Sequence, residues 1–160
     1  MTVSYKPPTV PPSTADTLHH RKAQCCRFAD TKDWSSFRTL FLPTATAKFT
    51  ETDGSVIKED GKALSFETLD SLIDYFSNAF AKQQTMHMTG PGEVELLDED
   101  SVKAVWPVIY HAGSRGVIGG WGGSGGGHYH EVWRRVEGEW LIAELVFVRT
   151  YWKVQMGRLD

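Results

Sequence analysis

The strongest constraint on the fold comes from the last strand-forming segment of the chain, residues 140–152, which is largely apolar on both of its alternating faces. A strand with two apolar faces belongs in the middle of a sheet and needs cover on both sides. Helices can cover one side. The simplest cover for the other side is the sheet itself, curled into a half-barrel around an inner cavity. We therefore expect a strongly curved sheet with a pocket inside it.

Helical patterns come before most of the strand patterns. Apolar residues spaced by three and four predict a helix from Ser65 to Phe80, and two earlier helices are predicted at 14–28 and 32–42. After Gln84 the pattern favours strands bounded by turn residues. The predicted strands are 46–50, 85–89, 93–97, 101–111, 127–136 and 140–152. The predicted class is α+β, with about three N-terminal helices packed on a strongly curved, mostly antiparallel sheet.

The length of 160 residues suits one domain. Residues 2–12 hold four of the seven prolines and show no apolar period, so residues 1–12 are expected to form a disordered or extended arm. Residues 13–160 are then a single folded domain. Its six tryptophans suit a core or a pocket wall.

Charge and hydropathy argue against several partners. The net charge is −3, and no cluster of Lys or Arg is larger than Arg134-Arg135, so neither a nucleic acid nor a membrane is an expected partner. The polar, proline-rich N-terminus lacks the apolar stretch of a signal peptide, and we expect a cytoplasmic protein. Cys25 and Cys26 are adjacent in a predicted helix, where a disulfide would be strained, so buried reduced thiols are expected.

Two motifs resemble cofactor sites but lack the required context. The glycine-rich segment 116–127 contains a spacing like GxGxxG, yet a strand follows it instead of a helix. We interpret it as a flexible hairpin connection that could act as a lid. His128 and His130 form an HxH pair, but arginines occupy the position where a cupin-like metal site needs a Glu. No metal and no organic cofactor are predicted.

Strand alternation makes Glu131 a candidate functional residue. His128 and His130 share one face of the strand, whereas Tyr129, Glu131 and Trp133 share the other. A carboxylate between two aromatic side chains is costly to bury unless it is paired or used. The alternative is a carboxylate at the rim, in contact with an arginine.

Four further residues carry candidate chemistry. His87 lies in a short strand, and His111 ends the next long one; either could transfer protons or be a structural histidine. Asp30 lies between two helical segments, where a helix cap explains it as well as catalysis does. Arg38 falls two turns after Asp30 if the two helices are nearly continuous, which would place both on one inward stripe.

Four blocks of sequence resemble, in order, scytalone dehydratase and the wider SnoaL-like, NTF2-like superfamily. They are FADTKDWSSFRTLFLPTATAKF, QTMHMTG, DEDSVKAVWPVIYH and HYHEVWRRVEGEWLIAEL, which lie within residues 15–152. The resemblance implies a cone of three helices packed on a curved antiparallel sheet, with the active site inside the cone. This agrees with the order of elements deduced above.

The resemblance also implies roles for individual residues. Asp30, His87 and His111 fall where the dehydratase keeps an Asp and two His, of which the Asp orients a His that moves a proton. Tyr129 falls at a pocket-facing Asn, which would place Glu131 on the inner face. Two pocket tyrosines of the dehydratase are replaced here by Ala29 and Phe49. The two tyrosines that hold a water against the substrate carbonyl in that enzyme are therefore missing from this sequence.

The resemblance implies a cofactor-free isomerase or cyclase, like the semipinacolase of fungal indole alkaloid pathways. In the predicted mechanism, Glu131 or an Asp30–His111 pair removes a proton, and Arg38 with a tyrosine or His87 stabilises the developing oxyanion. The alternatives are a dehydratase and a non-catalytic binding module. The sheet's exposed side is expected to form a homodimer. The expected substrate is a bulky polycyclic natural-product intermediate such as an indole alkaloid, and its predicted binding residues are Tyr110, Tyr129, Trp34, Phe49, Trp106 and Trp133.

Overall fold

The computed structural model describes residues 10–157 of the chain. Its helices are α1 (Pro12–Thr31), α2 (Trp34–Arg38) and α3 (Leu69–Ala81). The short strands are β2 (Lys58–Glu59), β3 (Lys62–Ala63) and β4 (Ser65–Phe66). The longer strands are β1 (Phe41–Glu51), β5 (Gln83–Thr89), β6 (Glu93–Asp98), β7 (Ser101–Ser114), β8 (Trp121–Val136) and β9 (Glu139–Met156).

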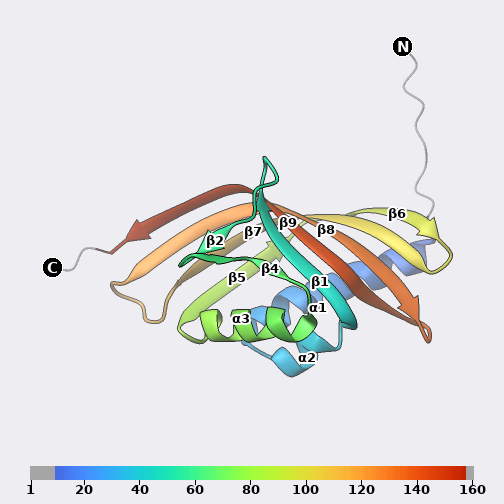
Figure 1. Cartoon of the computed structure of the whole chain (residues 1–160), viewed down its shortest axis with the longest axis horizontal. Coiled ribbons are helices and arrows are strands. Elements are labelled where there is room, and N and C mark those ends of the chain that lie inside the picture. The colour runs from blue at the N-terminus through green and yellow to red at the C-terminus, as the bar shows by residue number, and fades with distance from the viewer. Residues whose placement is uncertain (1–9, 158–160) are drawn as a thin grey trace, which may run out of the picture.

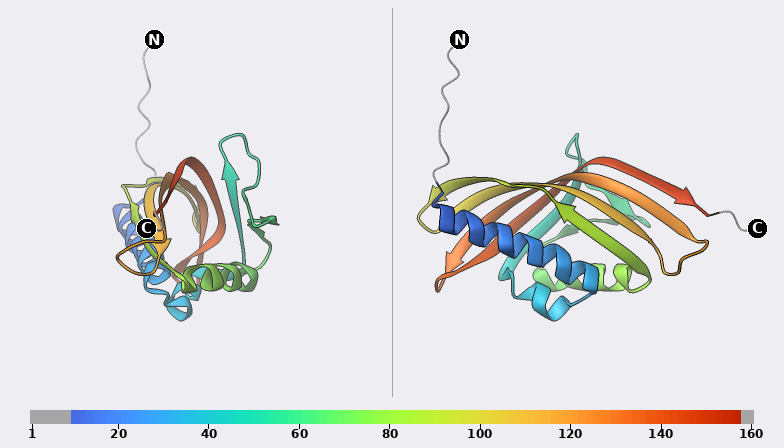
Figure 2. Two further views of the ribbon diagram at one scale, coloured as in Figure 1. Left: turned by 90° about the vertical axis from the view of Figure 1, so that its left-hand side faces the viewer. Right: turned by 180° about the vertical axis from the view of Figure 1, so that it is seen from behind.

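Seven of the strands form one sheet in the order β4-β1-β9-β8-β7-β5, with β6 also paired to β7. The β1–β9 pair runs parallel, and the other pairs of this sheet are antiparallel. The long strands bend, so the sheet arches over the helices (Figure 1), and the end view in Figure 2 shows its curl. The predicted α+β class and the curved, mostly antiparallel sheet are confirmed, and β9 is central as its two apolar faces require.

The helices cover the concave side of the sheet, with α1 lying along its underside in the right-hand view of Figure 2. Helix α1 ends where Lys32 adopts a left-handed conformation with φ 60°. Helix α3 is capped at its N-terminus by Thr68, whose side chain accepts a hydrogen bond from the backbone N–H of Ser71. The buried face of α3 carries Leu69, Leu72 and Ile73.

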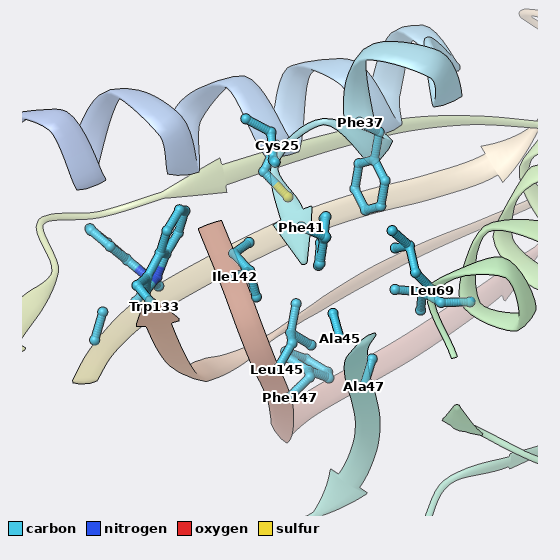
Figure 3. Close-up of a cluster of buried hydrophobic side chains, with 14 of the residues drawn as sticks. Cys25, Phe37, Phe41, Ala45, Ala47, Leu69, Trp133, Ile142, Leu145 and Phe147 are labelled. Atoms are coloured by element: carbon cyan, nitrogen blue, oxygen red, sulfur yellow. The ribbon is translucent and has the colours of Figure 1, made fainter. Parts of the chain in front are cut away.

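The apolar core lies between these layers. Figure 3 shows Phe37 and Phe41 beside Cys25, with Ile142, Leu145 and Phe147 of β9 nearby. These side chains are all at most 9% exposed. Each large apolar side chain buried in this way contributes roughly 1.5–3 kcal/mol to folding. The central strand β9 therefore joins the sheet to the helix layer.

The second helix is shorter than predicted. Only Trp34–Arg38 is helical, and the chain enters β1 at Phe41. Pro43 does not end a helix, because it lies inside β1 where the pairing with β9 shifts register between Phe41 and Thr46. A proline lacks the N–H that a regular ladder needs, so it is tolerated at such an irregularity.

Most of the glycine-rich segment is strand, which corrects the predicted flexible connection. Residues 121–127 pair with β7 and β9 as the first half of β8, and the turn spans only 115–120. Two glycines of this half lie beneath aromatic rings. A Cβ atom at Gly123 would collide with Trp152, and one at Gly125 would collide with Tyr110. Here glycine makes room for neighbouring rings on the same sheet.

The arm predicted at residues 1–12 falls mostly outside the described residues, since residues 1–9 are not described. Val10 is buried, and α1 begins at Pro12, where the fixed φ of proline suits the first helical position. The folded part therefore begins before Ser13. No helix within residues 10–157 combines the length and apolar character needed to cross a membrane.

The convex face of the sheet carries exposed apolar side chains on β5, β7 and β9. They include Met86, Met88, Ile109 and Tyr151, each at least half exposed. The homodimer expected from this face stays a prediction. Sedimentation velocity would test it, and a monomer at micromolar concentration would contradict it.

Candidate active site

A cavity with two adjoining lobes lies on the concave side of the sheet. The inner lobe has a volume of about 80 Å³ and reaches α1, where Lys22, Cys25 and Cys26 line it. The outer lobe has a volume of about 140 Å³ and is lined in part by Tyr110 and Arg149. Five residues line both lobes: Phe49, Phe76, Phe80, His87 and Tyr129. A ligand at these shared residues would contact both ends of the cavity.

Asp30 and His87 form a hydrogen-bonded pair at the junction of the lobes. The Nδ1 atom of His87 lies 2.7 Å from Oδ1 of Asp30. The backbone N–H of His87 donates to Oδ2 of Asp30 at 2.8 Å, and the Thr85 hydroxyl donates to Oδ1 at 2.9 Å. Helix α1 supplies the carboxylate and β5 supplies its three donors. These bonds fix the orientation of both the carboxylate and the imidazole.

The electrostatics of this pair favour an ionised Asp30. Burial opposes ionisation, but the hydrogen bonds from His87 and Thr85, together with the charge of His87, outweigh it and lower the pKa of Asp30. An ionised carboxylate can only accept, so Nδ1 of His87 carries the hydrogen between them. Within the described residues no hydrogen bond occupies Nε2 of His87. This ring nitrogen is therefore available to a ligand.

The inner lobe ends at a second ion pair, between Lys22 of α1 and Glu131 of β8. Both side chains are sealed from solvent, with exposed fractions of 2% and 0%. The ammonium lies 3.7 Å from the centroid of the Tyr129 ring. Lys22 lines the inner lobe, whereas Glu131 lies behind it.

Glu131 accepts hydrogen bonds at both of its carboxylate oxygens. Oε1 accepts from Lys22, and Oε2 accepts from Nε1 of Trp106 at 2.8 Å and from Nε1 of Trp133 at 2.9 Å. The two tryptophans were predicted to bind substrate, but neither lines either lobe of the cavity. They hold the carboxylate instead. This geometry makes Glu131 the counter-ion of Lys22 and gives it no direct contact with a ligand in the cavity.

Aromatic side chains form much of the cavity wall. Trp34 and Phe49 line the inner lobe, and Tyr110 lines the outer lobe, where it stacks on His87 with centroids 5.6 Å apart. Burial raises the pKa of Tyr110 to about 12, although Arg149 opposes the shift. Burial also raises the pKa of Tyr129 well above its usual value. Both phenols therefore stay protonated at neutral pH and can donate hydrogen bonds.

His111 and Arg38 lie away from this cavity. His111 is exposed on the opposite face of the sheet from Tyr110 and shares a hydrogen bond of 2.8 Å with the Ser124 hydroxyl. The predicted Asp30–His111 pair is thus wrong, because Asp30 pairs with His87. Arg38 forms an exposed ion pair with Asp70. The left-handed turn at Lys32 breaks the helical continuity that would have turned Arg38 inward.

Lys22 is the cavity residue that sequence reasoning missed. It follows Leu18 by four residues and precedes Cys25 and Cys26 by three and four, so it lies on the buried stripe of α1. A lysine on an otherwise apolar stripe of a helix can be recognised in the sequence as a candidate buried functional residue. Thr85 and Arg149 were missed as well, and they carried no comparable signal.

Metal ligands are not gathered at this site. Across residues 10–157 no group of three or more His, Cys, Asp or Glu is arranged to hold a metal ion. Cys25 and Cys26 are both free and buried, and burial raises the pKa of each thiol. The polar groups that line the two lobes include the imidazole of His87, the ammonium of Lys22, the phenols of Tyr110 and Tyr129, the guanidinium of Arg149 and the two thiols.

Comparison with known proteins agrees with this geometry. The chain is 41% identical over 145 residues to the probable cyclase FGR4 of Gibberella zeae, covering 91% of this chain and 97% of that protein. Its fold is similar to that of a candidate scytalone dehydratase from Novosphingobium aromaticivorans DSM 12444, with a TM-score of 0.74 at 11% identity, over 91% of this chain and 90% of that one.

A second solved structure shares the fold. The hexachlorocyclohexane dehydrochlorinase LinA-type3 from Novosphingobium barchaimii LL02 gives a TM-score of 0.72 at 13% identity, over 91% of this chain and 92% of that one. The model of the SnoaL-like domain matches residues 15–146, which include most of α1, all of β5 and β7, and both members of the Lys22–Glu131 ion pair. The chain belongs to the SnoaL-like domain family.

Proposed function

We propose that this chain is an acid–base isomerase or cyclase in which His87 transfers the proton and Asp30 orients it. One observation carries the proposal: Asp30 holds Nδ1 of His87, which lines both lobes, while Nε2 of His87 has no hydrogen-bond partner within residues 10–157. The name of the Gibberella relative supports a cyclase. A positioned acid–base group of this kind contributes typically about 10²–10⁴-fold to a rate.

The reaction begins when Nε2 of His87 removes a proton from a hydroxyl or an activated carbon of the substrate. Asp30 stabilises the imidazolium that forms. The same nitrogen then returns the proton to another atom of the molecule. Because the proton that leaves is the proton that returns, the product has the mass of the substrate.

The proposed substrate is a bulky, partly aromatic natural-product intermediate such as an oxidised indole alkaloid. In a semipinacol-type rearrangement, the hydroxyl oxygen loses its proton and forms a C=O bond while a neighbouring carbon migrates to an adjacent imine carbon. The imine nitrogen then takes the proton from His87. The aromatic wall, with Trp34 and Phe49, favours a flat substrate and restricts its conformation.

The cavity wall supports rearrangement over dehydration. Ala29 lines the inner lobe and Phe49 lines both lobes, so neither position offers a hydroxyl that could hold a water against a carbonyl. A dehydratase would use the same His87 but would release a product lighter by one water. Product mass therefore separates the two reactions.

The test is an activity assay against a panel of oxidised polycyclic alkaloids, polyketides and meroterpenoids, with product mass and chirality measured together. We expect one stereoisomer of unchanged mass from the native protein and none from a His87→Asn variant. His128→Asn is the matched control, because His128 is exposed on the convex face. Full activity of His87→Asn would exclude the mechanism, and loss of water would assign a dehydratase.

A further inference from the structure

The ammonium of Lys22 occupies the closed end of the cavity with only part of its hydrogen-bonding capacity used. Within residues 10–157 its one hydrogen-bond acceptor is Glu131, and its positive charge also faces the Tyr129 ring. An ammonium has three donors. Since Lys22 lines the inner lobe and Glu131 does not, the positive end of this ion pair faces the cavity.

Stability does not explain a charge pair in this position. Removing two charges from water costs several kcal/mol each, and apolar side chains of similar volume often give an equal or more stable core. Here Trp106 and Trp133 also donate to Glu131, which holds its charge away from the cavity. The arrangement keeps an ammonium fixed in an apolar site, where its field on a ligand is strong.

We infer that Lys22 binds a substrate oxygen that becomes negatively charged during the reaction. The charge develops on this oxygen when His87 removes a proton from the substrate. The inference rests on the proposed function and adds a second catalytic residue to it. Lys22 and His87 both line the inner lobe, so a planar molecule between them can contact both. The ligand class is an aromatic or conjugated molecule with a phenolic, enolic or carbonyl oxygen at its buried end.

The charge state of Lys22 suits this role and not that of a nucleophile. Burial opposes the ammonium, but the carboxylate of Glu131 and its hydrogen bond outweigh burial and raise the pKa of Lys22. A protonated amine has no lone pair with which to attack a carbonyl carbon. A fixed positive charge that needs no reorganisation during the reaction is the arrangement that stabilises an oxyanion.

The test uses 7-hydroxycoumarin, a fused aromatic phenol whose absorbance differs between its neutral and ionised forms. Its pKa is measured when bound to the native protein and to the double variant Lys22→Met/Glu131→Gln. The double variant removes both charges together, and the Gln oxygen can still accept from the two indole N–H groups. Circular dichroism and thermal unfolding confirm that it folds.

We expect the phenol bound to the native protein to have a pKa at least one unit below that of the free phenol, which is a tenfold preference for the phenolate. The double variant should lose this decrease. The same bound pKa in both proteins would overturn the inference, and so would failure of the phenol to bind the native protein.

The His87→Asn variant separates this inference from the proposed function. It should keep the lowered pKa of the bound phenol, because Lys22 is intact, while it loses turnover. If the lowered pKa disappears with His87 instead, then His87 and not Lys22 holds the oxyanion. His87→Asn could also stay active while the lowered pKa of the bound phenol is lost in the Lys22→Met/Glu131→Gln variant. In that case His87 is not the base, but Lys22 still binds the oxyanion.

Discussion

Two ion pairs each place one side chain in the wall of the same cavity, His87 from the Asp30–His87 pair and Lys22 from the Lys22–Glu131 pair, and they differ in what can reach them. The Asp30–His87 pair lies at the junction of the lobes, and the side chains of both residues keep at least a tenth of their surface exposed. The Lys22–Glu131 pair lies at the closed end, with almost none. The first leaves a ring nitrogen free to exchange a proton. The second has a carboxylate whose oxygens are already occupied, so it can hold a charge but cannot act as the base.

This difference shows that burial alone does not identify the base of an acid–base site. Glu131 is the most deeply buried carboxylate of the cavity region, and the expected cost of burying it made it one of the candidate bases. Its two oxygens accept three hydrogen bonds, from Lys22, Trp106 and Trp133. Asp30 is less buried, yet its pairing with His87 is what prepares a nitrogen for chemistry.

The largest expected effect tests the Asp30–His87 pair. Replacing Asp30 by Asn keeps the shape of the side chain but removes the charge that orients and stabilises a protonated His87. We expect kcat to fall by roughly 10²–10⁴-fold with KM little changed. Steady-state kinetics on the substrate found by the panel would measure this. A decrease smaller than fivefold would mean that the pair is structural.

The next largest effect tests the Lys22–Glu131 pair through the free energy of unfolding. Glu131→Leu leaves the ammonium of Lys22 buried without a counter-ion, and we expect a loss of about 3–5 kcal/mol in the free energy of unfolding. Lys22→Met/Glu131→Gln should lose far less, because no unpaired charge remains. Urea denaturation of both variants measures the difference. Equal losses of stability in the two variants would contradict the expected cost of an unpaired buried charge.

A smaller effect tests the Asp30–His87 pair through the pH dependence of stability. The pKa of Asp30 is lowered by folding, so its stabilising contribution is complete above its unfolded pKa of about 4 and is lost as the pH falls through the lower folded value. Between pH 6 and pH 3, Asp30→Asn should therefore lose less stability than the native protein. Parallel pH dependences for the two proteins would contradict the lowered pKa.

The smallest effects concern the residues outside the cavity. Arg38→Ala and His111→Asn should each change kcat/KM by less than about twofold, since surface substitutions away from a site usually alter free energies within ±0.5 kcal/mol. Both were predicted to be catalytic from the sequence. A tenfold loss in either variant would mean that the functional cavity extends beyond the residues that line it here.

The fold was predictable because it depends on patterns that repeat along many residues. The two apolar faces of residues 140–152 required a central strand, and the spacing of three and four required helix α3. Single positions were harder. Adjacent residues on a strand point to opposite faces, so Tyr110 and His111 could not both face inward. Applying that rule would have removed His111 from the candidate site.

Other parts of the site depended on local backbone geometry that the sequence does not display. Arg38 faces solvent because one left-handed residue, Lys32, breaks the helix. Nothing about a lysine predicts a positive φ. Lys22 was different, since its place on the buried stripe of α1 was visible as a pattern. The pairing of Lys22 with Glu131, 109 residues apart, required the tertiary structure.

The glycines of β8 beneath Tyr110 and Trp152 have a consequence for how relatives of this chain can diverge. Both rings line the outer lobe, and each sits where a single methyl group would displace it. A glycine codon becomes an alanine codon by one base substitution. A lineage can therefore reshape the outer lobe through single point mutations in β8, and so change the molecules it accepts, without altering the Asp30–His87 pair on α1 and β5.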